Sequence, residues 1–290
     1  MKGAIVGLGT MGPGIAATLA RGGLEMTCFD VAAEQLRKAD AEMRALQVKV
    51  AFESDLARAV AGADLVVEAV PERLELKHQL FRDLEKLVPA KTILASNTSG
   101  IPITRIQEAV SNKGRVVGMH WSNPPHIIPM VEVIAGKHTD ASVVQSARKL
   151  LVDCGLIPVV VEKDVPGFVH NRLLYAILRE AVSLVENGVV SPEELDKCFK
   201  WGLGLKLAVI GPMELLDVAG LDIYEAVAGY LNADLENRPN VAPYVTRLTR
   251  EKHLGMKTGK GIFDYTPERT QQLRSERGAK LLAVMKAMQS

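Results

Sequence analysis

Cysteine is scarce in this chain of 290 residues. Only Cys28, Cys154 and Cys198 are present, and no two of them have Cys-x-x-Cys spacing. This pattern provides neither a disulfide framework nor a sulfur-rich zinc site, so we predict no metal centre. Glycines interrupt the apolar N-terminal residues too early for a signal peptide. We therefore expect a cytoplasmic protein.

Long apolar runs and an excess of charge are also lacking. No run of about 18 apolar residues occurs, so we expect no transmembrane helix. Lys and Arg number 35 and Asp and Glu number 34, a net charge of +1, which argues against a nucleic-acid-binding protein. Aromatic residues make up 4% and hydrophobic residues 48%, which indicates a folded protein with a mainly aliphatic core.

Short apolar runs alternate with amphipathic stretches in the first part of the chain. Such runs, bounded by turn residues, are typical of buried strands. They are residues 3–6, 24–29, 48–52, 65–70, 92–96, 115–119, 130–134 and 156–161. Strands that alternate with helices at this spacing predict an α/β fold, a Rossmann-type doubly wound parallel sheet covered on both faces. We assign it to residues 1–163.

The pattern changes after residue 163, where strand signals almost disappear. Residues 167–187 predict one long helix, and Ser191-Pro192-Glu193-Glu194 is a capping box that predicts the start of another. We therefore predict a smaller all-α domain over residues 164–290.

A glycine-rich motif, Gly7-Leu8-Gly9-Thr10-Met11-Gly12, follows the first predicted strand and opens a helix. In this context Gly7 allows a tight turn, Gly9 lets the backbone approach a pyrophosphate, and Gly12 lets the helix pack on the strand. Asp30 ends the second strand, where its carboxylate can bind both ribose hydroxyls and would repel a 2′-phosphate. We predict an NAD site made by Gly7, Gly9, Thr10, Met11, Gly12 and Asp30; a glycine-rich turn without a ligand is the alternative.

Six further segments resemble those of the 3-hydroxyacyl-CoA dehydrogenase family, in the family's order. They are EAVPERLELK (68–77), SNTS (96–99), HWSNP (120–124), VEVI (131–134), GFVHNRLL (167–174) and GMKTGKGIFDY (255–265). The resemblance implies an NAD-dependent oxidoreductase that transfers a hydride between NAD and a 3-hydroxy or 3-oxo group. It also implies that the helical domain 164–290 binds substrate and forms the interface of a homodimer. We assign part of the apolar runs 207–216 and 221–231 to this interface.

Oxidation of a secondary alcohol needs a base for the hydroxyl proton. His120 follows a predicted strand, and a returning strand would place Glu132 beside it, where a carboxylate fixes the tautomer of the imidazole. The resemblance implies this His–Glu dyad and assigns Ser99 and Asn171 to hydrogen bonds with the substrate oxygen. Taken alone, Ser99 could be a turn residue and Asn171 a helix cap.

The resemblance also implies supporting residues around the dyad. Asn97 and Asn123 match residues that support the nicotinamide and the dyad, and Glu72 and Lys77 match an acid and a lysine near the nicotinamide. Glu72 and Lys77 could instead form a solvated helix face. The other histidines have no metal-ligand spacing: His78, His126, His138, His170 and His253.

Two departures from the acyl-CoA pattern bear on the substrate. The segment between Asp30 and Val66 lacks most of the helical insertion that meets the coenzyme A adenine in acyl-CoA members. Residues 202–212, GLGLKLAVIGP, are longer than the family's usual version and resemble members that act on free hydroxy acids, such as carnitine and gulonate dehydrogenases. Lys206 or His126 could pair with a small carboxylate, although Lys206 could also be a solvated loop lysine.

The sequence therefore leaves more than one substrate possible. The main expectation is a 3-hydroxy group on a small carboxylic acid or its CoA ester. The loop HWSNPPHIIPM (120–130) instead resembles a pyridine-carboxaldehyde dehydrogenase of vitamin B6 degradation. A non-catalytic structural or nucleotide-sensing protein on the same scaffold is the alternative of another class, but it predicts loss of the dyad.

Overall fold

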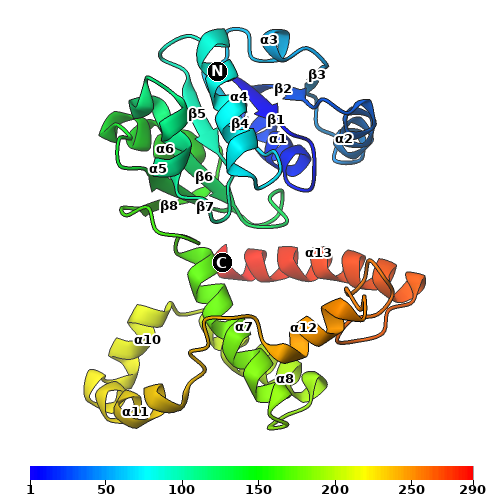
Figure 1. Cartoon of the computed structure of the whole chain (residues 1–290), viewed down its shortest axis with the longest axis vertical. Coiled ribbons are helices and arrows are strands. Elements are labelled where there is room, and N and C mark those ends of the chain that lie inside the picture. The colour runs from blue at the N-terminus through cyan, green and yellow to red at the C-terminus, as the bar shows by residue number, and fades with distance from the viewer. Residues whose placement is uncertain (290) are drawn as a thin grey trace. The chain divides into compact units, whose positions relative to one another are not determined.

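The computed structural model describes residues 1–289 and divides into two compact units (Figure 1). The first unit is Met1–Arg172 and the second begins at Leu173. Helix α7, His170–Glu186, begins in the first unit and continues into the second. The sequence placed the boundary slightly earlier, at residues 163–164. Ser290, the last residue of the predicted helical domain, lies outside the described residues.

The first unit contains an eight-stranded sheet with the order β3-β2-β1-β4-β5-β6-β7-β8. The strands are β1 (Lys2–Val6), β2 (Glu25–Phe29), β3 (Ala51–Glu53), β4 (Leu65–Glu68), β5 (Ile93–Ser96), β6 (Val116–Trp121), β7 (Met130–Ala135) and β8 (Ile157–Val161). All neighbouring strands are parallel except β6 and β7. The strand order reverses at β1 and β4, and open α/β sheets bind ligands at the carboxyl ends of strands at such a point.

Helices cover both faces of this sheet, which confirms the predicted doubly wound architecture. They are α1 (Gly12–Arg21), α2 (Ala33–Ala45), α3 (Leu56–Ala59), α4 (Leu74–Leu87), α5 (Ile103–Ile106) and α6 (Ala141–Asp153), with short 3-10 turns η1 (Gln107–Ala109) and η2 (Lys113–Arg115). Alternate side chains of each strand point to opposite faces, so the sheet has two separate aliphatic cores.

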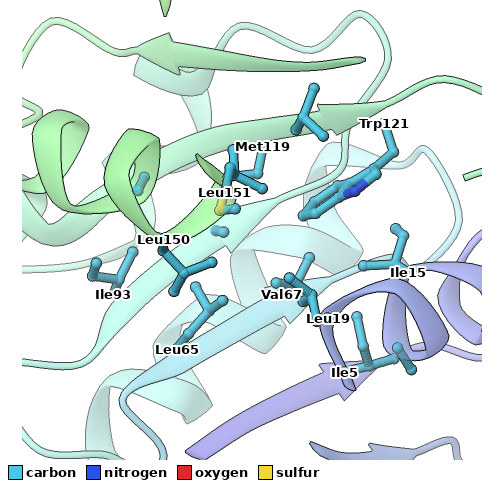
Figure 2. Close-up of a cluster of buried hydrophobic side chains, with 14 of the residues drawn as sticks. Ile5, Ile15, Leu19, Leu65, Val67, Ile93, Met119, Trp121, Leu150 and Leu151 are labelled. Carbon is cyan, nitrogen blue, oxygen red and sulfur yellow. The ribbon is translucent and has the colours of Figure 1, made fainter. Parts of the chain in front are cut away.

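One core packs α1 and α6 against the sheet. Figure 2 shows Ile15 and Leu19 of α1 and Leu150 and Leu151 of α6 against strand residues such as Val67. The other core packs Phe81 and Leu84 of α4 against the opposite face. Burial on both sides explains why the strands are continuous apolar runs, and it fixes the strand ends that carry the polar site residues.

The second unit is helical, as the sequence predicts. After α7 it contains α8 (Pro192–Cys198), the π-helical turn η3 (Phe199–Gly204), α9 (Leu205–Leu207), α10 (Pro212–Ala219), α11 (Leu221–Asp234), α12 (Pro243–Arg250) and α13 (Pro267–Gln289). Ser191 caps α8, since its hydroxyl accepts a hydrogen bond from the N–H of Glu194. Glu186 of α7 binds Arg238 Nη1 at 2.7 Å and the N–H of Tyr244 at 2.7 Å, which ties the later segments to α7.

Apolar side chains of the second unit lie largely in solvent. No residue described from Leu173 onward is buried. Trp201 is 77% exposed, Val209 84% and Val218 72%. A folded domain of this size normally buries well over half of the surface of its chain.

None of the helices described in residues 1–289 is long and apolar enough to cross a membrane.

Candidate active site

The turn after β1 has the geometry of a dinucleotide-binding loop. Gly7 has a φ of +103°, and a Cβ there would lie 2.7 Å from the carbonyl carbon of Ala69, so a side chain is excluded. A Cβ on Gly12 would collide with the carbonyl oxygen of Gly7. Gly9, in contrast, faces open space. No side chain caps the start of α1 next to it, so the N–H groups of the first turn can bind a phosphate.

Asp30 lies directly after β2, at the same end of the sheet. Its Oδ2 accepts a hydrogen bond from the N–H of Leu8 at 2.7 Å, and its Oδ1 accepts one from the N–H of Ala32 at 2.9 Å. A carboxylate has about four acceptor positions, so both oxygens can still bind ribose hydroxyls. The open Gly9, the uncapped helix and the fixed carboxylate together fit NAD.

We expect Asp30→Asn to weaken NAD binding about 10- to 100-fold and to narrow the preference for NAD over NADP, because the neutral amide is a weaker acceptor and repels a 2′-phosphate less. Titration of protein fluorescence with NADH and NADPH measures both dissociation constants. Asp153→Asn, at an exposed position on α6, is the matched control. Unchanged constants in Asp30→Asn would contradict the assignment.

The predicted dyad is present in the structure. His120 and Glu132 are register partners on the antiparallel strands β6 and β7. His120 Nδ1 lies 2.7 Å from Glu132 Oε2, and both side chains are buried. A carboxylate only accepts hydrogen bonds, so the hydrogen is on Nδ1 and Nε2 is the basic nitrogen.

Glu132 also fixes the start of α7. Its Oε1 accepts hydrogen bonds from the N–H groups of Val169 at 2.8 Å and His170 at 3.0 Å. The chain turns into this position through Gly167 and the buried Phe168, which has a φ of +50°. Burial alone would raise the pKa of Glu132, but the hydrogen bonds from His120 and the two N–H groups outweigh it and lower the pKa. The carboxylate is thus ionised at neutral pH.

Ser99 and Asn171 are in contact, and their binding of a substrate oxygen stays a prediction. Asn171 Nδ2 donates to the carbonyl oxygen of Ser99 at 2.9 Å. Glu72 holds the same loop, because its Oε1 accepts hydrogen bonds from Ser99 N at 2.9 Å and from Thr98 Oγ1 at 2.6 Å. Burial raises the pKa of Glu72, yet these hydrogen bonds and Lys77 lower it overall. Ser99 itself is exposed, so its hydroxyl is accessible to a substrate.

Lys77 is buried and does not lie on a solvated helix face. Its side chain is 1% exposed, and its ammonium contacts Glu68 Oε1 at 2.6 Å and Glu72 Oε2 at 3.3 Å. Glu68 is also buried and accepts hydrogen bonds from Ser96 Oγ at 2.6 Å and Val70 N at 2.8 Å. Lys77 is therefore connected to the Ser99 loop by Glu72, which contacts both.

Two further candidates from the sequence, Asn97 and Asn123, lie near the ends of β5 and β6. Asn97 Oδ1 accepts a hydrogen bond from the N–H of Trp121 at 2.9 Å, which locks the end of β5 to the end of β6, beside His120. Asn123 lies in the loop after β6.

The two proposed carboxylate partners, His126 and Lys206, belong to different units of the chain. His126 lies against α1, where its Nδ1 would be 3.4 Å from a Cβ on Gly14. Burial lowers the pKa of His126, which disfavours the cation that a carboxylate needs. Lys206 lies in α9 of the second unit, and its role as a carboxylate partner stays a prediction.

The sequence analysis missed Glu68 and Ser96, and it left His170 without a role. A glutamate inside the apolar run 65–70 was the available signal, because a buried charge needs a partner. Across residues 1–289, no group of three or more His, Cys, Asp or Glu side chains is placed to hold a metal ion.

Comparisons with known proteins agree with this geometry. The model of the 3-hydroxyacyl-CoA dehydrogenase NAD-binding domain matches residues 2–165, and that of the C-terminal domain matches residues 167–265. A 5-formyl-3-hydroxy-2-methylpyridine 4-carboxylate 5-dehydrogenase from Mesorhizobium japonicum is 52% identical over 99% of this chain and 97% of its own. A probable 3-hydroxybutyryl-CoA dehydrogenase from Bacillus subtilis is 32% identical over 90% of this chain and 96% of its own.

A solved structure extends the likeness to three dimensions. The crystal structure of a 5-formyl-3-hydroxy-2-methylpyridine 4-carboxylic acid 5-dehydrogenase, described as an NAD+-dependent dismutase, has a TM-score of 0.97 at 52% identity. It covers 100% of this chain and 98% of its own.

The dinucleotide loop, Asp30 and the dyad define an NAD-dependent dehydrogenase that acts on CH–OH groups. The chain belongs to the 3-hydroxyacyl-CoA dehydrogenase family. The alternative of a non-catalytic protein on this scaffold is wrong, because both domain models of a dehydrogenase match and the His120–Glu132 pair is intact.

Proposed function

We propose that this protein oxidises the aldehyde of a pyridine carboxaldehyde that carries a neighbouring carboxylate, as in 5-formyl-3-hydroxy-2-methylpyridine 4-carboxylate. The observation that carries the proposal is the 52% identity over almost the full length of both chains. The likeness to 3-hydroxybutyryl-CoA and L-carnitine dehydrogenases is lower, at 32% and 35%. The match therefore favours the aldehyde over the 3-hydroxy acid or CoA ester of the main expectation.

The dyad supplies the base for such a reaction. An aldehyde has no hydroxyl proton, but its hydrate, a geminal diol, has two hydroxyl groups on the reacting carbon. His120 Nε2 takes one hydroxyl proton, and Glu132 stabilises the imidazolium that forms. Gly9, the start of α1 and Asp30 would hold NAD, which would supply the hydride acceptor for that carbon. Ser99 and Asn171 lie on the loop and helix assigned to hold the substrate oxygen.

The substrate is tested by steady-state kinetics. We expect kcat/KM for the pyridine aldehyde to exceed that for 3-hydroxybutyryl-CoA, L-carnitine and 3-hydroxybutyrate by at least about tenfold, because a site shaped for one substrate leaves polar groups unpaired with another. NADH formation is followed by absorbance for each compound. A higher kcat/KM for the CoA ester or for a free hydroxy acid would contradict the proposal and favour the main expectation.

The same site would also support the reduction of the aldehyde to an alcohol, a separate reaction from the oxidation of its hydrate. The relative of known structure is described as a dismutase, and His120 as an imidazolium can return a proton to an aldehyde oxygen. We therefore propose that this protein also reduces the aldehyde to an alcohol when NADH is present.

We also propose that the protein is a cytoplasmic homodimer formed through the second unit. The absence of buried residues there supports this, as do Val209, Met213 and Val218, which are 84%, 70% and 72% exposed. Light scattering at micromolar protein should give twice the mass of the chain. Val218→Asp on α10 should reduce that mass toward the monomer, whereas Val152→Asp on α6 of the first unit should not. A monomeric unmodified protein would contradict the proposal.

A further inference from the structure

A second imidazole lies beside the dyad. His170 is the first residue of α7 and is partly exposed. Its ring centroid lies 6.2 Å from that of His120, with the rings edge to face. Its Nε2 is 3.5 Å from Ser122 Oγ, and its backbone N–H donates to Glu132 at 3.0 Å. The backbone hydrogen bond thus holds the start of α7, which carries this ring, beside the dyad.

Oxidation of an alcohol at this site needs only one base. The alcohol loses one hydroxyl proton, and His120 Nε2 takes it. An aldehyde, in contrast, first has to gain a water molecule, and this step needs a base for the water proton and an acid for the carbonyl oxygen. One imidazole cannot be the base and the acid at the same moment.

We propose that His170 is a catalytic base that adds water to the aldehyde; the inference rests on the proposed aldehyde substrate. The water oxygen bonds to the carbonyl carbon, and the water proton passes to the His170 ring. The C=O π bond breaks, and its electron pair stays on the oxygen. That oxygen takes a proton from the imidazolium of His120.

The step is balanced, since an aldehyde and one water give one geminal diol and one proton moves from His120 to His170. It leaves His120 neutral, with Nε2 free to accept the next proton. The dyad is therefore in the correct state to take a hydroxyl proton from the diol. One protonated and one neutral imidazole thus form the diol, and the dyad then takes a hydroxyl proton from this diol during its oxidation.

A comparison of aldehyde oxidation with aldehyde reduction distinguishes a base for hydration from a residue that only positions the substrate or the dyad. Oxidation of the aldehyde needs hydration, but its reduction to the alcohol does not. We expect His170→Phe, which keeps an aromatic ring against His120, to lower kcat for oxidation about 10²- to 10³-fold. Reduction of the same aldehyde with NADH should keep a kcat within about threefold of the unmodified protein, because His120 alone supplies its proton. His138→Ala, at an exposed histidine, is the control for both directions.

Hydration can also be measured without NAD. Magnetisation transfer in proton NMR between the aldehyde and hydrate signals of the pyridine substrate gives the hydration rate directly. The unmodified protein should increase this rate, and His170→Phe should not. Exogenous imidazole should restore oxidation in His170→Ala, which a purely structural role of His170 would not allow.

Three results would overturn the inference. Equal losses of oxidation and reduction in His170→Phe would mean that the ring holds the substrate or the dyad. Unchanged oxidation, or unchanged hydration by NMR, would mean that it is not the base. An unmodified protein that turns over neither direction of the pyridine aldehyde, but oxidises a hydroxy acid or CoA ester, would remove the proposed function and the inference with it.

Discussion

Replacing His120 with alanine is expected to lower kcat by about 10²- to 10⁴-fold, the usual cost of removing a general base. The affinity for NADH should change little, because the dinucleotide loop and Asp30 belong to other strands of the sheet. The loss should appear equally in kcat and kcat/KM, since the proton is transferred only in the transition state. Stopped-flow or steady-state NADH formation measures the rate, and fluorescence titration measures the affinity.

Glu132→Gln tests the second residue of the dyad. The amide keeps an oxygen for the N–H groups at the start of α7, but it no longer stabilises the imidazolium of His120. We expect a smaller loss of kcat than in His120→Ala, together with a shifted pH profile of the remaining activity. Near-normal turnover in His120→Ala would show that the reaction uses another base.

Removing the buried lysine is expected to have the largest effect on stability. Lys77 and Glu68 are 1% and 0% exposed and lie 2.6 Å apart. A buried ion pair adds little net stability, but loss of one partner leaves an uncompensated charge, at a cost of about 3–5 kcal/mol. Lys77→Met should therefore lower the free energy of unfolding by this amount, as measured by urea denaturation. Glu68→Gln/Lys77→Met should be more stable than Lys77→Met alone, because no charge then remains unpaired.

The pH dependence of the Lys77→Met variant should identify the cause. Burial raises the pKa of Glu68, and Lys77, Ser96 and Val70 oppose this rise. Without Lys77 the rise should be larger, so the folded state holds a proton that the unfolded state releases at a lower pH. Stability is then greatest at acidic pH and falls as the pH rises through the folded pKa. A penalty that is equal at mildly acidic and mildly alkaline pH would point to lost packing instead.

Loss of an exposed ion pair should affect stability much less than loss of the buried pair of Lys77 and Glu68. Lys149 and Asp153 on α6 are 76% and 59% exposed. Lys149→Met should change the free energy of unfolding by no more than about 1 kcal/mol, because water and salt screen such pairs.

Local patterns were sufficient for the fold and for the NAD loop. Strand period, glycine spacing and the capping box at Ser191 each depend on residues close in sequence, and the structure has the corresponding strands, turn and cap. The pairing of His120 with Glu132 was also predictable, because a short loop between two strands forces an antiparallel neighbour.

The sequence did not show which charged side chains are buried. Glu72 and Lys77 have the sequence pattern of a solvated helix surface, yet Lys77 is enclosed between two carboxylates. His126 was expected near the substrate because of its loop, but that loop packs on α1. Glu68 and Glu72 lie close to Lys77 in sequence, but only the folded chain brings both carboxylates onto its ammonium. The helix that lies against His126 is far away in sequence.

The sequence by itself determined the class of enzyme. The glycine-rich turn and Asp30 at the end of the second strand indicate an NAD site, and the resemblance of six further segments to the family implied the paired histidine. Only the tertiary structure decided which other polar groups share that site. It joined Glu72 to the Ser99 loop, Asn171 to Ser99, and His170 to the dyad through Glu132. The physical reason is that the carboxyl ends of β4, β5 and β6 lie at one edge of the sheet, and the start of α7 is bound there by a single carboxylate.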